Sequence, residues 1–146
     1  MAEIIKYTKL NEYAQEPTRG SEYAAGYDLY AAISNPRTIG PGVTNLVPTG
    51  LSFELPNNTF AAIFPRSGLA TKQGLRLANC VGVCDSDYRG EYMIALHNDS
   101  KQAQIINPGD RIAQMILLPY IEMQFEEATV LSETERGEGG FGSTGA

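Results

Sequence analysis

Short apolar segments, separated by turn-forming residues roughly every 8–12 positions, are the feature that most limits how this chain of 146 residues can fold. Residues 59–64 and 111–120 are two such segments, and each follows a turn that contains a proline, at Pro56 or Pro108. Strands of this length, following one another without long helical patterns, are typical of sandwiches and barrels. The sequence contains no repeat of fixed period. The sequence therefore predicts an all-β sandwich or barrel.

The expected strands follow the apolar segments along the chain. The alternation of Tyr27, Leu29 and Ala31 indicates a strand that carries Asp28 on its opposite face as a lone carboxylate. Further strands are expected at residues 4–10, 43–55 with a break at Pro48 and Gly50, 59–64, 75–83, 92–96, 101–107, 111–120 and 121–131, with one or two helical turns at 65–72. Residues 1–131 are expected to form one β domain, followed by a tail at 132–146.

Composition narrows the class of protein. The chain is 42% hydrophobic and 19% charged, as in folded globular proteins. Its net charge is -6 and its 11 basic residues form no run, so the surface needed to bind duplex nucleic acid is not expected. No segment is long and apolar enough for a membrane span, and the N-terminus does not resemble a signal peptide. We therefore expect a cytoplasmic protein without nucleic-acid or membrane partners.

A polar stretch at residues 82–91 concentrates charged side chains between two apolar segments, in an expected order of strand, tight turn and strand. Asp85 and Asp87 are two positions apart, and a tyrosine, an arginine and a glutamate follow. Paired carboxylates suit a hydrated divalent cation or a general base for water, but Asp, Ser and Gly also favour turns for local hydrogen bonding. Taken alone, the stretch favours turn chemistry, and the later ligands of a calcium loop are missing.

Two further segments carry groups suited to an anion. Arg66, Ser67 and Gly68 begin the expected helical turns and offer a guanidinium, a hydroxyl and backbone N–H groups. Gln114 lies in a strand expected to be buried on both faces over much of its length, so its amide needs a protein, water or ligand partner. An ordinary strand-to-helix connection explains the first segment equally well.

The cysteines and the one histidine predict little chemistry. Cys80 and Cys84 are expected to be free thiols in a chain without an export signal, and with His97 they are too few for a zinc site. His97 is expected to have a structural or surface role.

The tail at residues 132–146 is rich in glycine and has one aromatic residue, Phe141. A segment of this kind cannot pack a core and is expected to be flexible when free. Phe141 could stack on a ring while Ser143 and Thr144 close on phosphates, which would make the tail a lid. A disordered linker is the alternative.

Five stretches in order, from residue 25 to residue 145, resemble the motifs of the homotrimeric dUTPase family. They are Ala25-Gly26-Tyr27-Asp28-Leu29, Pro65-Arg66-Ser67-Gly68-Leu69-Ala70, residues 82–91 (GVCDSDYRGE), Gly109-Asp110-Arg111-Ile112-Ala113-Gln114-Met115-Ile116 and residues 136–145 (RGEGGFGSTG). Each motif is weak by itself, but all five in order are highly specific. Cys84 is the small departure, since the family usually has an aliphatic residue there.

The resemblance implies a distorted jelly roll, a homotrimer with active sites at subunit interfaces, and a tail that closes over a neighbour's site. It implies hydrolysis of dUTP to dUMP and pyrophosphate, assisted by Mg²⁺, which keeps uracil out of DNA and supplies dUMP for dTMP synthesis. Asp85 is the implied base that orients the attacking water. Tyr88 would pack against the deoxyribose, where a ribose hydroxyl would clash. Mg²⁺ would be bound mainly through the substrate phosphates.

The remaining implied roles fall into two sets. The substrate-binding residues are Arg66, Ser67, Gly68, Asn79, Val83, Tyr88, Met93, Gln114, Arg136, Gly140, Phe141, Gly142, Ser143 and Thr144. Asp28, Asp87 and Arg111 have supporting roles, Asp28 near the metal and its waters, and Asp87 and Arg111 in a salt-linked framework.

Two other functions remain open at this point. A dCTP deaminase, with or without diphosphatase activity, shares the implied trimeric fold, but the stretch at 82–91 and the tail with its phenylalanine are closer to the dUTPase pattern. A non-catalytic β-sandwich that only binds nucleotide or protein would have no need for the water-orienting Asp85.

Overall fold

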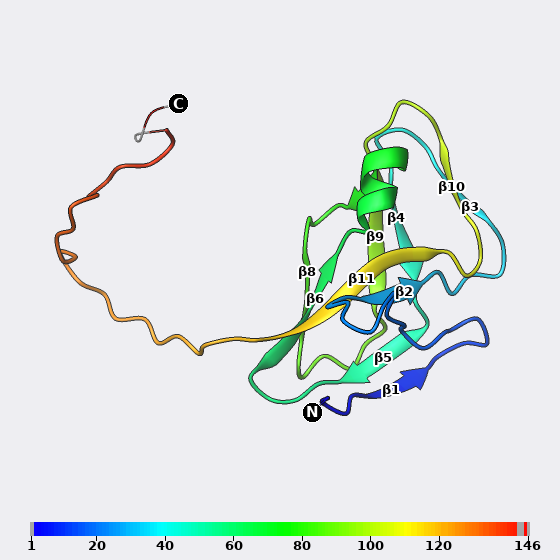
Figure 1. Cartoon of the computed structure of the whole chain (residues 1–146), viewed down its shortest axis with the longest axis horizontal. Coiled ribbons are helices and arrows are strands. Elements are labelled where there is room, and N and C mark those ends of the chain that lie inside the picture. The colour runs from blue at the N-terminus through cyan, green and yellow to red at the C-terminus, as the bar shows by residue number, and fades with distance from the viewer. Residues whose placement is uncertain (1, 143–144, 146) are drawn as a thin grey trace.

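A β body and an extended C-terminal segment make up the chain (Figure 1). The computed structural model describes residues 2–142 and 145. Within them the strands are β1 (Lys6–Lys9), β2 (Tyr27–Tyr30), β3 (Arg37–Ile39), β4 (Thr44–Pro48), β5 (Leu51–Glu54), β6 (Thr59–Phe64), β7 (Leu75–Leu77), β8 (Gly82–Asp85), β9 (Met93–Asn98), β10 (Gln104–Ile106) and β11 (Arg111–Pro119). One π-helical turn, η1 (Leu69–Gln73), follows β6. The all-β prediction is confirmed.

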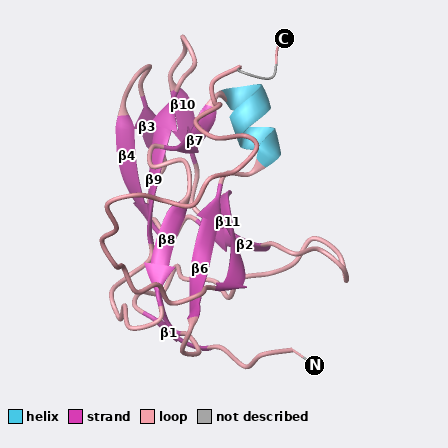
Figure 2. Cartoon of the chain, turned by 90° about the vertical axis from the view of Figure 1, so that its left-hand side faces the viewer, coloured by secondary structure: helices cyan, strands magenta, loops and turns pink. Residues whose placement is uncertain are grey.

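The strands form four small sheets, and every strand pair is antiparallel. The largest has the order β2-β11-β6-β8, a second has the order β4-β9-β7, and β1-β5 and β10-β3 are two-stranded. Figure 2 shows η1 at one end of this body. Fully buried side chains from the different sheets form one core, among them Leu29, Val47, Leu51, Ile94, Leu96 and Ile106.

Strand β11 is central to the largest sheet because it pairs with β2 along one edge and with β6 along the other. Its first half is buried on both faces, as Ile112 and Ala113 show. From Ile116 to Leu118 the side chains are only half-buried. The expectation of burial on both faces is therefore confirmed for the first half of the strand.

One expected strand is absent, one observed strand was not predicted, and the strands on either side of the polar stretch do not pair with each other. Residues 121–131 form no strand in the described structure and are exposed, because no other part of the described chain pairs with them. The strand β3 was not predicted. Strands β8 and β9 flank the polar stretch, but they belong to different sheets, since β8 pairs with β6 and β9 pairs with β4 and β7. The expected turn is present, since residues 86 and 87 form a turn closed by the bond from the N–H of Tyr88 to the carbonyl of Asp85, but the polar stretch connects two different sheets.

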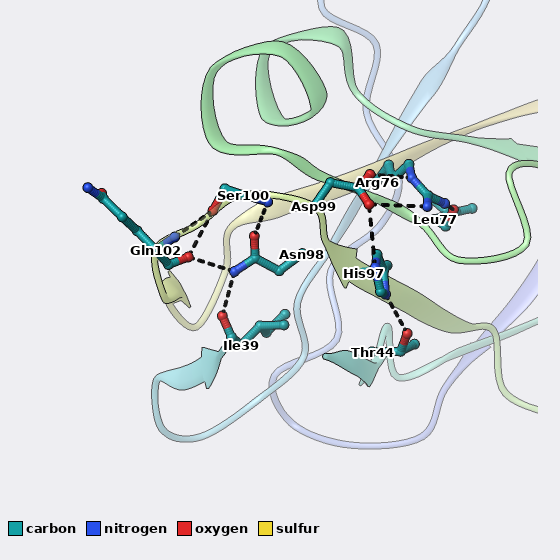
Figure 3. A network of polar contacts seen from close by, with 9 residues as sticks. All are labelled: Ile39, Thr44, Arg76, Leu77, His97, Asn98, Asp99, Ser100 and Gln102. Carbon is teal, nitrogen blue, oxygen red and sulfur yellow. Dashed lines mark hydrogen bonds and ion pairs between the residues drawn. The ribbon is translucent and has the colours of Figure 1, made fainter. Parts of the chain in front are cut away.

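Asn98 is one of two fully buried polar residues among those described, and its side chain is well satisfied. Its amide nitrogen donates to the carbonyls of Ile39 and Gln102, at 2.8 and 2.7 Å, and its amide oxygen accepts from the backbone of Ser100 at 2.8 Å (Figure 3). A buried amide with all these bonds stabilises one arrangement of the backbone around it. Asn98 thus joins the end of β9 to β3 and to the turn before β10.

The connection between β4 and β5 depends on Gly50. Its φ is +67°, and a Cβ there would lie 2.8 Å from the Cβ of Ala14 and 3.1 Å from that of Ala32. We expect Gly50→Ala to lower the free energy of unfolding by about 2–3 kcal/mol, from backbone strain together with overpacking. Urea unfolding at one fixed protein concentration measures the change.

The matched control is Gly20→Ala, because nothing lies within 4 Å of a Cβ at Gly20. This variant is expected to stay within about 0.5 kcal/mol of the wild type. Equal stabilities for the two variants would contradict the assignment of Gly50.

Candidate functional site

Asp28 lies at the centre of a small ionic cluster at one end of the largest sheet. Its Oδ1 accepts from Nε of Arg66 at 2.9 Å, and its Oδ2 lies 3.6 Å from Nη1 of Arg111. The Asp28 side chain is only 13% exposed. Its carboxylate is therefore engaged by two guanidinium groups and holds Arg66 in place. Arg111 is thus paired with Asp28, and the described residues show no ion pair between Arg111 and Asp87.

Gln114 stands beside this cluster, because Asp28, Gln114 and Phe64 are aligned across β2, β11 and β6. Its Nε2 donates to the carbonyl of Pro65 at 3.0 Å, which supplies the partner that the sequence required. A Cβ at Gly26 would lie 2.3 Å from Oε1 of Gln114, so only glycine permits this approach. The amide thus joins β11 to the segment that leads into η1.

Ser67 and Gly68 follow Arg66 at the start of η1, and both are exposed. The backbone of Gly68 is helical, with φ -65° and ψ -42°. The hydroxyl of Thr71 donates to the carbonyl of Ser67 at 2.8 Å, which ties the first turn together. Arg66, Ser67, Gly68 and Gln114 therefore form one group, in which the hydroxyl of Ser67 and the backbone of Gly68 face solvent.

Asp85 is the last residue of β8 and is exposed. The backbone N–H of Tyr88 donates to its carbonyl at 3.2 Å, and Nη1 of Arg89 donates to the carbonyl of Ser86 at 2.7 Å, so the loop is held by its own bonds. Within the described part of the chain, neither Asp85 nor Asp87 has an ion-pair partner. The carboxylate of Asp85 is thus open to water.

Tyr88 lies three residues beyond Asp85 with 44% of its surface exposed. Its hydroxyl donates to the carbonyl of Glu91 at 3.0 Å, and its ring stacks on that of Tyr92 with centroids 6.1 Å apart. Glu91 is held in turn, since its Oε1 accepts from the N–H of Gly50 at 3.0 Å. The exposed ring is thus presented in one orientation beside Asp85.

The turn that precedes β8 offers backbone groups to a ligand. Asn79 is exposed, and its carbonyl accepts from the N–H of Val81 at 2.7 Å. Cys80 adopts a φ of 64°, in the left-handed region. Val83 on β8 and Met93 at the start of β9 are also exposed, at 65% and 41%.

The two groups lie at opposite ends of the same sheet. Asp85 is aligned with Phe60, at the beginning of β6, whereas Arg66 follows the end of β6. The four steps of extended chain from Phe60 to Phe64 alone span about 13 Å, and Arg66 and Ser67 come after them. One chain therefore does not bring Asp85 and Tyr88 to Ser67 and Gln114.

The tail forms a third, separate group. Figure 1 shows it running away from the β body. Arg136 donates from Nε to the carbonyl of Gly139 at 2.8 Å, and Phe141, Gly140 and Gly142 are exposed. Ser143 and Thr144 lie outside the described residues.

A groove of about 680 Å³ lies beside β1 and β5. Arg89 is the one residue of the polar stretch that lines it.

Elsewhere in the described structure, the expectations concern His97 and the clustering of potential metal ligands. His97 bonds to Thr44 through Nδ1 at 2.9 Å and lies 3.4 Å from Asp99 through Nε2 (Figure 3), as expected of a structural residue. The described residues contain no group of three His, Cys, Asp or Glu side chains placed to hold a metal ion. The carboxylate of Asp28 is already paired with Arg66 and Arg111. A cation bound here would therefore have to take most of its oxygen ligands from the bound ligand itself. No described helix is long and apolar enough to cross a membrane.

The dUTPase family model matches residues 12–145. The chain is 47% identical over 142 residues to the deoxyuridine 5'-triphosphate nucleotidohydrolase of Rickettsia massiliae, covering 97% of this chain and 96% of that protein. It is 48% identical to the enzyme of the same name from Desulfitobacterium hafniense, over 97% of this chain and 94% of that protein. The chain belongs to the dUTPase family.

Solved dUTPases share its fold. A dUTPase of Staphylococcus bacteriophage 80alpha, solved with dUpNHpp, has a TM-score of 0.86 at 23% identity, over 99% of this chain and 100% of that one. A dUTPase from phage phi11 of S. aureus, described with a structural Mg(II) ion, has a TM-score of 0.81 at 20% identity, over 90% of this chain and 100% of that one. The resemblance drawn from the motifs is thereby confirmed.

Sequence reasoning missed the residues that support the candidate site from behind. Gly26 and Gly90 were noted only as parts of motifs, although each leaves room for a polar or aromatic side chain of the site. Tyr92 was counted only as part of an apolar segment, but its ring lies under Tyr88. Gly90 stands between the charged residues Arg89 and Glu91, and that position could have indicated a close contact. Nothing in the sequence indicated the role of Tyr92.

The buried hydroxyl of Tyr92 makes stability depend on pH. Burial, with the adjacent Cys84 thiol, raises the pKa of Tyr92 above its ordinary value of 10.0. The unfolded chain then loses this proton at lower pH than the folded chain, so the free energy of unfolding falls as pH rises above about 10. As the pH rises from about 8 to about 11, we expect the free energy of unfolding to fall less in Tyr92→Phe than in the wild type.

At neutral pH the same variant removes a hydroxyl that has no partner among the described residues. It is therefore expected to match the wild type or to exceed its unfolding free energy by about 1 kcal/mol. Urea unfolding across the pH series measures both effects, and parallel curves for the two proteins would contradict the pH assignment.

Proposed function

We propose that this protein hydrolyses dUTP to dUMP and pyrophosphate. The observation that carries the proposal is the exposed carboxylate of Asp85 beside the fixed ring of Tyr88, in a chain of the dUTPase family. The named function of the curated relatives supports it. In the cell this reaction would keep uracil out of DNA and supply dUMP for dTMP synthesis, which places the enzyme in the cytoplasm.

In this proposal Asp85 orients the water that attacks the α-phosphorus and accepts its proton. A carboxylate within hydrogen-bonding reach of a water is a sufficient general base. Tyr88 packs against the deoxyribose, while the turn at Asn79 and the exposed strand at Val83 pair with the uracil edge. Met93 lies next to this surface, at the start of β9.

The phosphates are held by the second group. Ser67 and Gly68 are exposed, and a hydroxyl and a backbone N–H group suit phosphate oxygens. Arg66 is oriented by Asp28, and Gln114 closes the same end of the sheet. Mg²⁺ bound to the substrate phosphates would neutralise their charge, and it keeps its waters without a protein cage.

We propose further that the site is completed by neighbouring copies in a homotrimer. The separation of the two groups at opposite ends of β6, about 13 Å within the strand alone, supports this, because neighbouring copies could bring complementary groups to one nucleotide. The exposed segment after β11 supports it as well. Ile121, Met123 and Phe125 are 89%, 72% and 86% exposed and alternate as in a strand, which suits pairing with another copy.

The first test is a substrate panel of dUTP, dTTP, dCTP, UTP and dUDP, each with Mg²⁺, scored for pyrophosphate and for ammonia. Pyrophosphate from dUTP alone is the expected result. Ammonia from dCTP would assign the protein to the deaminases that share the fold. No turnover of any nucleotide would leave a binding module and overturn the role of Asp85.

Asp85→Asn tests the base. We expect its turnover of dUTP to fall by at least about 100-fold, because the amide cannot accept the proton of the water. Binding of the non-hydrolysable analogue dUpNHpp, measured by calorimetry, is expected to stay within about threefold of the wild type, since the change is isosteric. The matched control is Asp87→Asn, which makes the same change at a neighbouring exposed carboxylate that has no ion-pair partner among the described residues. Unchanged turnover in Asp85→Asn would contradict the assignment.

Removal of residues 136–146 tests the lid. The truncated protein is expected to keep its size in gel filtration, because the described tail residues contribute nothing to the core, and to lose most of its turnover. A change of oligomeric state would show that the tail belongs to the assembly instead.

Mixed trimers then test whether the tail of one copy serves another. Equal amounts of Asp85→Asn and of the truncated protein are unfolded together and refolded. If the tail closes over a neighbouring copy, one site in four combines an intact tail with Asp85, and about a quarter of wild-type activity returns. If each tail serves its own chain, no such site forms and activity stays at the level of the separate variants.

A further inference from the structure

Tyr92 is held rigidly where the polar loop joins β9. It is only 2% exposed. Its N–H donates to the carbonyl of Leu51 at 2.8 Å, and its own carbonyl accepts from the N–H and the hydroxyl of Thr49, at 3.2 and 2.7 Å. The backbone of Tyr92 is therefore bonded on both sides to the connection between β4 and β5, which leaves its ring little freedom to shift.

The ring of Tyr92 forms the support for the ring of Tyr88. Phe53 packs against Tyr92 with centroids 4.6 Å apart, and Tyr88 stacks on Tyr92 with an interplanar angle of 24°. The hydroxyl of Tyr92 has no hydrogen-bond partner among the described residues. The ring of Tyr92, by contrast, contacts the rings of both Phe53 and Tyr88, so its contribution to the position of Tyr88 is assigned to the ring.

Gly90 limits Tyr88 from a second direction. A Cβ at Gly90 would lie 2.3 Å from the hydroxyl oxygen of Tyr88 and 2.4 Å from its Cζ, while the backbone of Gly90 is not in the left-handed region. Glycine is thus required by contact with the ring and not by backbone conformation. Together with the bond from the Tyr88 hydroxyl to the carbonyl of Glu91, these contacts leave one position for the ring.

We propose that Tyr92 and Gly90 are positioning residues that set the selectivity between deoxyribonucleotide and ribonucleotide. The inference rests on the proposed function, in which Tyr88 packs against the deoxyribose. Rejecting one additional hydroxyl requires that the surface beside the sugar cannot move aside. Tyr92 is buried and Gly90 has no side chain, so both act through the ring of Tyr88.

The test compares kcat/KM for dUTP and for UTP, by pyrophosphate release, in the wild type and three variants. Tyr92→Phe keeps the ring and is expected to keep the wild-type preference for dUTP within about twofold. Tyr92→Leu removes the stacked ring, and Gly90→Ala displaces the Tyr88 ring. Both are expected to lower the dUTP/UTP ratio by about tenfold, through faster turnover of UTP relative to dUTP.

Gel filtration and thermal unfolding accompany the kinetics. Gly90→Ala adds one methyl group beside the exposed ring of Tyr88 and removes nothing from the core, so it carries the test even if Tyr92→Leu does not fold. An unchanged dUTP/UTP ratio in Gly90→Ala and in any folded Tyr92→Leu overturns the proposal, even where both activities fall. Loss of preference in Tyr92→Phe overturns the role of the ring. A wild type that does not turn over dUTP contradicts the proposed function itself, which is a separate result.

Discussion

Strand β11 forms hydrogen bonds along both of its edges, with β2 and with β6, and each group of the candidate site is placed relative to this strand. The pairing aligns Asp28, Gln114 and Phe64 in one row. Because Arg66 follows Phe64 by two residues, the row brings the arginine to the carboxylate of Asp28. The antiparallel pairing of β6 with β8 then sets Asp85 at the opposite end of the sheet. Strand register thus creates the group proposed to bind phosphates and separates it from Asp85, the proposed base.

The loop between β8 and β9 shows how a fold of short strands can present a rigid polar surface. It leaves one sheet and enters another, and its end is bonded to the connection between β4 and β5 through Thr49 and Glu91. Aromatic packing from Phe53 through Tyr92 continues this support to Tyr88. The exposed face of the loop therefore carries the residues proposed for the chemistry, while buried side chains behind it supply the rigidity that selective recognition needs.

Much of the fold could be predicted because burial leaves a period of two in the sequence. The strands at 27–30, 59–64 and 111–119 follow directly from alternating or continuous apolar side chains. Residues 121–131 have the same kind of pattern and yet form no strand within this chain. A strand pattern indicates a preference for pairing, but it does not say whether the partner lies in the same chain. The short β3 was missed because its three residues include one apolar side chain, Ile39, and lie between Pro36 and the turn-forming residues 40–42.

The sequence by itself determined the all-β class, the identity of the motif residues and the family, since composition, periodicity and motif order are properties of one dimension. Only the tertiary structure decided which side chains meet. Arg111 pairs with Asp28 of another strand, Gln114 lies between β2 and β6, and the ring of Tyr92 stacks on that of Tyr88. The positions of these residues in the sequence do not show that they are in contact. The physical reason is that register and sheet crossing set distances across the chain, and residue types alone do not encode register. The same register keeps Asp85 and Ser67 at opposite ends of one sheet.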